Sequence, residues 1–128
     1  MQKKIETLVS QTSDSLRTLD DVRVFMSKYR SEPDSSFGLP SVEKVFSDFS
    51  GDCAGAAVAG KWALERIGRP ASVYFLVSRD WGHCIAVSDD KKIMISNRDV
   101  VELADPADWE SEVMRIFKNS YDDIIKAE

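Results

Sequence analysis

Apolar residues recur at helical spacing in the first third of the chain. Thr18 is a good N-cap, and Asp21 falls in the first turn that would follow it. The apolar positions of this segment lie on one face of a helix: Leu19, Val22, Phe25, Met26 and Tyr29. Residues 31–40 hold two prolines, three serines and one glycine, which predicts a loop. We therefore expect a helical N-terminal extension over residues 1–38.

Two further helices are expected in the middle of the chain. Ser41 can cap a short helix, and Asp52 is a good N-cap for a longer one over residues 53–67. The longer segment is rich in alanine and glycine, and Gly68 followed by Pro70 ends it. The second helix would therefore begin at a cysteine.

The pattern changes from helix to strand after residue 70. Strands rich in β-branched and apolar residues are expected at 71–78, 83–88, 92–96 and 100–103, giving a sheet of three to four strands. Because their connections are so short, the strands must be antiparallel. Asp105 and Pro106 open a last helix over residues 105–120, and the acidic tail after it is expected to fray. Helices followed by a meander predict an α+β fold, with the helix over residues 53–67 packed across the sheet.

The chain length fits one domain of 128 residues, with residues 39–104 as its core and residues 105–120 as a C-terminal helix. The net charge of -5 disfavours nucleic acid and anionic membranes as partners. The lysines near the N-terminus are followed by no apolar run, and no stretch approaches the roughly 20 apolar residues that span a bilayer.

The cysteines and the histidine also limit the possible sites. There are two cysteines, Cys53 and Cys84, which form no CxxC motif, and one histidine cannot complete a zinc finger with them. A chain of this size needs no disulfide, so we expect two free thiols and a cytoplasmic location. We expect no metal and no cofactor.

Cys53 is the candidate nucleophile. It would occupy the first turn of a helix, where the positive end of the macrodipole and unpaired backbone N–H groups favour a thiolate. The small residues that follow leave room for a substrate beside the sulfur, and the backbone N–H of Cys53 is placed to stabilise an oxyanion.

His83 is the only histidine, and it is therefore the only candidate for a base that works near neutral pH. Side chains alternate along a strand, so His83 shares one face with Ile85 while Cys84 lies on the other. We expect His83 to face the helix of Cys53 and Cys84 to point away from it.

A third group usually orients the imidazole. The end of the third strand offers Ser96, Asn97 and Asp99. Asn97 is our choice because an amide oxygen can accept the ring N–H. Asp99 is the alternative that would also stabilise an imidazolium, and Ser96 stays open as well.

In this order, these residues resemble the transglutaminase-like cysteine peptidases of the wider papain-like superfamily, and most closely their bacterial group. The segment LPSVEKVF leads into GDC at 51–53, the apolar residues IAV follow His83, and IleSerAsn stands at 95–97 where the family has LeuAspAsn. The resemblance covers roughly residues 39–100. It implies a papain-like fold and a Cys53–His83 pair that cleaves an amide bond of a protein or peptide through an acyl-enzyme, as a peptidase, amidase or deamidase.

Two positions differ from the family pattern. Ala54 stands where the family often has an acidic residue, so a calcium site using both acids beside the cysteine is not expected. Ser96 stands in the place of the catalytic aspartate. The resemblance is therefore also compatible with an inactive domain that binds or scaffolds, and the sequence indicates neither the substrate nor the oligomeric state.

Overall fold

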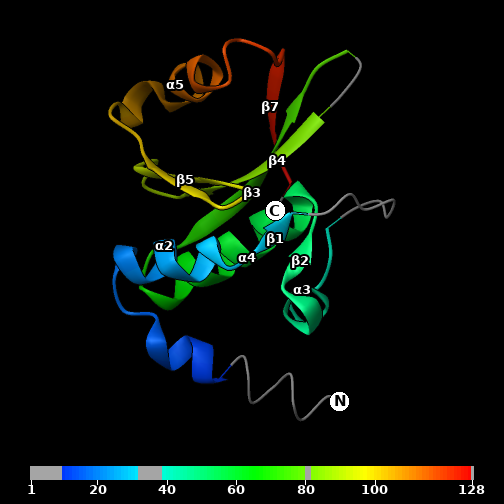
Figure 1. Ribbon diagram of the computed structural model, residues 1–128. Helices are drawn as coiled ribbons and strands as arrows, with labels where there is room; N and C mark the ends of the chain where they lie inside the picture. The colour runs from blue at the N-terminus through cyan, green and yellow to red at the C-terminus, as the bar shows by residue number, and fades with distance from the viewer. Residues whose placement is uncertain (1–9, 32–38, 80–81, 128) are drawn as a thin grey trace.

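The computed structural model describes residues 10–31, 39–79 and 82–127, and it has the predicted α+β architecture. Figure 1 shows a central sheet with α2, α3 and α4 on one side and α5 on the other. The helices are α2 (Leu19–Ser27), α3 (Val42–Asp48), α4 (Cys53–Arg66), the 3₁₀-helix η1 (Pro106–Asp108) and α5 (Trp109–Ile116). The strands are β1 (Arg30–Ser31), β2 (Ser50–Gly51), β3 (Ala71–Val77), β4 (Gly82–Ser88), β5 (Ile93–Ser96), β6 (Asp99–Glu102) and β7 (Asp123–Lys126).

The predicted helix starts are confirmed at α2, α3 and α4. The last helix, expected over residues 105–120, is instead η1 at Pro106–Asp108 followed by α5 at Trp109–Ile116, and the Asp105 side chain caps neither. The Thr18 hydroxyl accepts the N–H of Asp21, whose carboxylate accepts the Thr18 N–H in return, and this forms a capping box at α2. Ser41 caps α3 and Asp52 caps α4. Residues 1–9 of the expected N-terminal extension and residues 32–38 of the expected loop lie outside the described residues.

The main sheet has five strands in the order β6-β5-β4-β3-β7, and all neighbouring strands are antiparallel. The first four are the expected meander. The fifth corrects the expectation that the tail frays, because β7 returns to the free edge of β3 and pairs Ile125 with Phe75. Ile124 packs against the apolar face next to Leu76, and burial of that side chain explains the pairing of so short and charged a segment.

The two faces of the sheet have different partners. Ala86 and Ile95 pack with alanines of α4 in one buried cluster. Ile85 and Val87 point to the opposite side, where they form a second cluster with Val113 of α5. The sheet is therefore buried on both faces, and α4 and α5 lie on opposite sides of it, as Figure 1 shows.

Gly60 lets α4 lie close to β5. A Cβ atom at this position would come 2.9 Å from Cγ2 of Ile95, which is fully buried. Gly60→Ala is expected to cost about 1 to 3 kcal/mol in overpacking. Better helix propensity returns about 1 kcal/mol, so a net loss of up to about 2 kcal/mol should appear in urea denaturation.

The control for this prediction is Lys61→Ala at the next position of α4. Among the described residues, the partly exposed Lys61 forms an ion pair with Glu65 one turn later, so its replacement should change the free energy of unfolding by less than about 0.5 kcal/mol. If Gly60→Ala is as stable as the unaltered protein, α4 does not rest on Ile95 as described.

No helix in the described part of the chain is long and apolar enough to cross a membrane.

Candidate active site

The candidate nucleophile is the first residue of α4. The Asp52 carboxylate accepts the N–H groups of Ala54 at 3.0 Å and of Gly55 at 3.3 Å, which fixes the start of the helix. Cys53 therefore lies at the positive end of the helix macrodipole, as the sequence predicts. Its side chain is half-buried, whereas the alanines after it are buried.

Tyr29, which follows α2, packs against the start of α4. Its ring is fully buried and its hydroxyl donates a hydrogen bond to the Asp52 carbonyl at 3.0 Å. A side chain on either Gly51 or Gly55 would collide with the same hydroxyl, so the two glycines make the close approach possible. The parallel pairing of β1 with β2 ties the residue after Tyr29 to Ser50.

Cys84 lies against Cys53, which corrects the prediction that it points away. The backbone N–H of Cys84 donates to the Cys53 sulfur at 3.4 Å, and its side chain is buried with Ala54 and Ala57 of α4. The alternation along β4 was predicted correctly, but α4 packs on the Cys84 face of the strand rather than on the His83 face. Periodicity separates the two faces of a strand without showing which one a helix covers.

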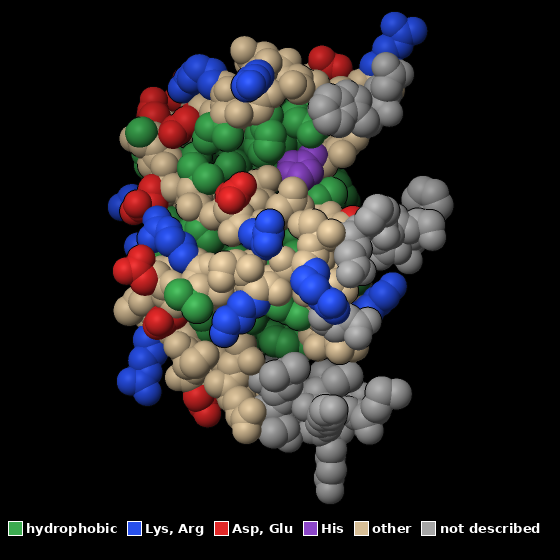
Figure 2. All heavy atoms as spheres, in the orientation of Figure 1, with side chains coloured by type: hydrophobic (Ala, Val, Ile, Leu, Met, Phe, Trp, Pro, Cys, Tyr) green, Lys and Arg blue, Asp and Glu red, His purple; other side chains and the backbone are tan. Residues whose placement is uncertain are grey.

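His83 nevertheless reaches Cys53, because it lies at the beginning of β4 beyond the residues that pair with β5. Its Nε2 atom is 2.8 Å from the Ser96 hydroxyl, and a hydrogen bond from the ring contributes to stabilising the Cys53 thiolate. Figure 2 shows His83, the single purple side chain, at the molecular surface beside hydrophobic side chains. His83 is therefore bonded to Ser96 on one side and helps to lower the pKa of Cys53 on the other.

The surroundings lower the pKa of Cys53 from 9.0 to about 4. The largest cause is the hydrogen bond from the Cys84 thiol, followed by the hydrogen bond from His83, the Cys84 backbone N–H and the charge of His83, while burial acts against them. The same contact and burial raise the pKa of Cys84, and the negative charges of Cys53 and Asp52 add to this. Cys53 is thus the thiolate and Cys84 the thiol of the pair.

The structure brings Ser96 to the imidazole, and not Asn97, our first choice. Met94 pairs with Val87, so the next residue on the same face of β5 is Ser96, which lies beside His83. Asn97 has a φ of 51° in the turn between β5 and β6, and its side chain makes no hydrogen bond within the described part of the chain. Asp99 pairs with Ser96 across that turn and is exposed to solvent.

Two aromatic residues beside His83 were not identified as site residues from the sequence. The ring of Phe117, which ends α5, lies 5.3 Å from the imidazole in a T-shaped contact. Tyr121 lies 6.4 Å away and is nearly parallel to the ring. Burial raises the pKa of Tyr121 and the charge of Cys53 adds to it, which places Tyr121 over the same site. Residue 121 belongs to the tail that the sequence predicts to fray, whereas the pairing of β7 with β3 and the ring contacts with His83 and Phe117 hold Tyr121 in place.

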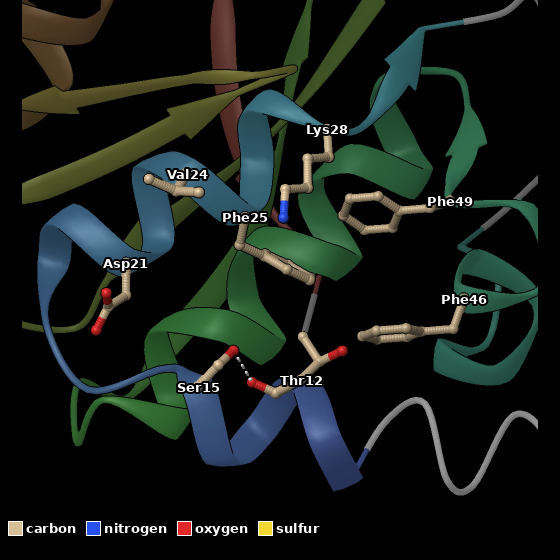
Figure 3. A pocket seen from close by; sticks show the side chains of 8 residues that line it. All are labelled: Thr12, Ser15, Asp21, Val24, Phe25, Lys28, Phe46 and Phe49. Carbon is tan, nitrogen blue, oxygen red and sulfur yellow. Dashed lines mark hydrogen bonds between the residues drawn. The ribbon is translucent and has the colours of Figure 1, made fainter.

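A pocket of about 420 Å³ lies elsewhere, between the helical segment at residues 10–15, α2 and α3. Figure 3 shows Phe25, Phe46 and Phe49 around it, with the Lys28 side chain directed toward it. None of Cys53, His83 and Ser96 lines this pocket. We therefore locate the candidate site at the start of α4 and not at this pocket.

The residues around Cys53 do not fit a calcium ion. One oxygen of the Asp52 carboxylate is engaged by the two N–H groups at the helix start, and Ala54 offers no side-chain oxygen. Within the described ranges no group of three acidic, histidine or cysteine side chains could hold a metal ion.

The similarity to known proteins is structural. No family model and no curated protein sequence matches the chain. Among solved structures, calcium-bound LapG of Legionella pneumophila matches with a TM-score of 0.60 and 17% identity, over 77% of this chain and 67% of that one. A second LapG structure matches over 96% of this chain and 72% of its own, with a TM-score of 0.60 and 15% identity. The EGTA-treated form of LapG also matches over 96% of this chain and 70% of its own, with a TM-score of 0.58 and 15% identity. The chain therefore has a fold like the transglutaminase-like fold of LapG.

Proposed function

We propose that this protein is a cysteine hydrolase that cleaves an amide bond of a protein or peptide through an acyl-enzyme. The observation that carries the proposal is the placement of Cys53 at the start of α4, with its pKa lowered in part by His83, whose Nε2 meets the Ser96 hydroxyl at 2.8 Å. A thiolate at a helix start, beside a histidine whose far nitrogen meets a hydroxyl, has the arrangement of a nucleophile, a base and an orienting group. The likeness in fold to LapG, a transglutaminase-like cysteine peptidase, supports the same chemistry.

The reaction follows from the positions of these atoms. The Cys53 sulfur attacks the substrate carbonyl carbon, and the oxyanion that forms is stabilised by the backbone N–H of Cys53. Because Nε2 of His83 faces Ser96, Nδ1 is left to hold the proton of the Cys53 thiol and to pass it to the leaving amine. Loss of the amine gives the acyl-enzyme, and a water activated by His83 then releases the acid and restores the thiolate.

Alkylation with iodoacetamide tests the activated thiol without knowledge of the substrate. Because the pKa of Cys53 is lowered to about 4, its thiolate persists at pH 6, and its labelling rate should change less than about twofold between pH 6 and pH 8. An ordinary thiol would gain close to a hundredfold over the same range. Peptide mass spectrometry locates the label, which should be on Cys53 rather than on buried Cys84.

His83→Ala is the companion variant. Without the imidazole the pKa of Cys53 should rise, so labelling at pH 6 should slow while labelling at pH 8 changes less. If Cys53 of the unaltered protein reacts like an ordinary thiol and His83→Ala changes nothing, the proposal of a cysteine hydrolase fails.

The second candidate function is a catalytically silent domain that keeps the fold for binding. One observation favours it: the group on the far side of His83 is the neutral hydroxyl of Ser96, which supplies no charge to stabilise an imidazolium. A silent domain retains a reactive Cys53 but never turns over. Steady release of p-nitrophenol from p-nitrophenyl acetate, beyond one equivalent per protein, separates the hydrolase from the silent domain.

A further inference from the structure

The two cysteines of this chain lie in contact across the packing of α4 on the sheet. Cys53 approaches from the helix and Cys84 from β4, and they share one apolar cluster with Ala54, Ala57 and Val73. The backbone N–H of Cys84 donates to the Cys53 sulfur at 3.4 Å, which brings the two cysteines side by side. Hydrolysis of an amide bond does not require a second thiol at this position.

The two sulfurs differ in exposure and in charge. Cys53 is half-buried and ionised, whereas Cys84 is only 5% exposed and keeps its proton. A peroxide from solvent therefore meets the Cys53 thiolate first, and thiolates are the form that peroxides oxidise. The neighbour that any oxidised Cys53 then meets is a thiol already in hydrogen-bonding contact.

We propose that Cys53 and Cys84 form an oxidation site in which a hydroperoxide converts Cys53 to a sulfenic acid and Cys84 resolves it to an intramolecular disulfide. In the first step the Cys53 sulfur takes one oxygen from hydrogen peroxide and, with one proton, a water is released. In the second step the Cys84 sulfur displaces the hydroxyl group of the sulfenic acid, and a second water leaves with the Cys84 proton. Two thiols lose two electrons in total, and the peroxide is reduced to two waters.

Oxidation of Cys53 to the sulfenic acid makes Cys84 a better nucleophile for the second step. While Cys53 is a thiolate, its charge and its hydrogen bond hold the proton on Cys84. A sulfenic acid is neutral, so oxidation of Cys53 removes both of these effects and leaves only burial and the charge of Asp52 acting on Cys84. Cys84 then ionises more easily, at the moment when a nucleophile is needed.

The local packing permits the bond. A disulfide requires the sulfurs to approach to about 2.05 Å, and the backbone N of Cys84 already lies 3.4 Å from the Cys53 sulfur. The α4 residues in the apolar cluster around the pair are the small Ala54 and Ala57, and Leu39 and Phe75 also pack against it. The disulfide would block the Cys53 sulfur as a nucleophile and would protect it from irreversible oxidation. This consequence for hydrolysis rests on the proposed function.

The test treats the whole protein with hydrogen peroxide in the presence of dimedone, which traps sulfenic acids. Intact mass should fall by two hydrogens, a non-reducing digest should contain one peptide joining Cys53 to Cys84, and dithiothreitol should restore both thiols. In Cys84→Ala the resolving thiol is absent, so Cys53 should instead carry dimedone. Without the trap, Cys53 of this variant should proceed to the sulfinic acid.

Cys53→Ala is the matched control, in which Cys84 should stay unmodified because it is buried. A dimedone adduct on Cys53 of the unaltered protein without the cross-linked peptide would overturn the proposal. A disulfide between two copies, seen as a dimer on a non-reducing gel, would overturn it as well. The cross-link is scored by mass and not by turnover, so its failure is distinguishable from failure of the hydrolase proposal.

Discussion

Replacement of Cys53 with alanine is expected to abolish acylation by p-nitrophenyl acetate, with a loss of about a thousandfold or more in the rate of p-nitrophenol release. The loss is large because alanine leaves no nucleophile at the start of α4. The remaining thiol, Cys84, is buried and its pKa is raised, so it cannot substitute. The assay follows p-nitrophenol by absorbance, and intact mass shows whether one acetyl group is attached.

Cys84→Ala is the control for this prediction. It removes the largest of the contributions that lower the pKa of Cys53, so acylation should persist while the pH at which it is half-maximal moves upward. Thermal unfolding of both variants shows whether the helix start is intact. Equal acylation of Cys53→Ala and the unaltered protein would exclude Cys53 as the nucleophile.

The helices and the meander were predictable because local chemistry sets their ends. Thr18, Ser41 and Asp52 each accept a backbone N–H at the start of a helix, as expected from their side chains alone. The strand β7 was not predictable in this way. Its four residues carry a charge at each end and are stabilised by the edge of β3, a partner some fifty residues earlier in the chain, and by packing of Ile124 against a buried cluster.

Of the candidate site, the placement of Cys53 at a helix start was predictable, and so was the choice of His83 as the candidate base. Cys53 and His83 follow from a helix start and from the presence of one histidine. The positions of Cys84 and Ser96 depend on which face of β4 receives α4 and on the register of β4 with β5, and both are set by tertiary packing. The amide of Asn97 is chemically a better partner for the imidazole than the hydroxyl of Ser96, which made it the first choice. However, Asn97 lies in the turn between β5 and β6.

Ser96 gives His83 a neutral hydrogen-bond partner on the Nε2 side of the ring. Its hydroxyl can fix the orientation and the tautomer of His83 through Nε2, but it carries no charge that would favour the imidazolium. On the other side of the ring lies Cys53, and His83 helps to lower the pKa of that thiol. The charge of the Cys53 thiolate disappears once the sulfur is acylated, so the histidine should lose its main electrostatic partner in the second half of the reaction.

Replacement of His83 with alanine is therefore expected to act more strongly on deacylation than on acylation. The activated ester releases p-nitrophenolate without help from an acid, so the acetyl-enzyme should still form, though more slowly. Hydrolysis of the acetyl-enzyme needs a base that activates water, and its rate should fall by about 10² to 10⁴. Intact mass should show acetylated protein accumulating in His83→Ala, while the unaltered protein returns to its free form.

Ser96→Ala and Ser96→Asp are the companions of this variant. Ser96→Ala loses only an orienting hydrogen bond worth about 1 kcal/mol, so deacylation should slow by about tenfold or less. Ser96→Asp supplies a carboxylate at Nε2, which stabilises the imidazolium after the thiolate charge is gone, and deacylation should accelerate. A His83→Ala protein that deacylates as fast as the unaltered one would show that the imidazole beside Cys53 is not the base.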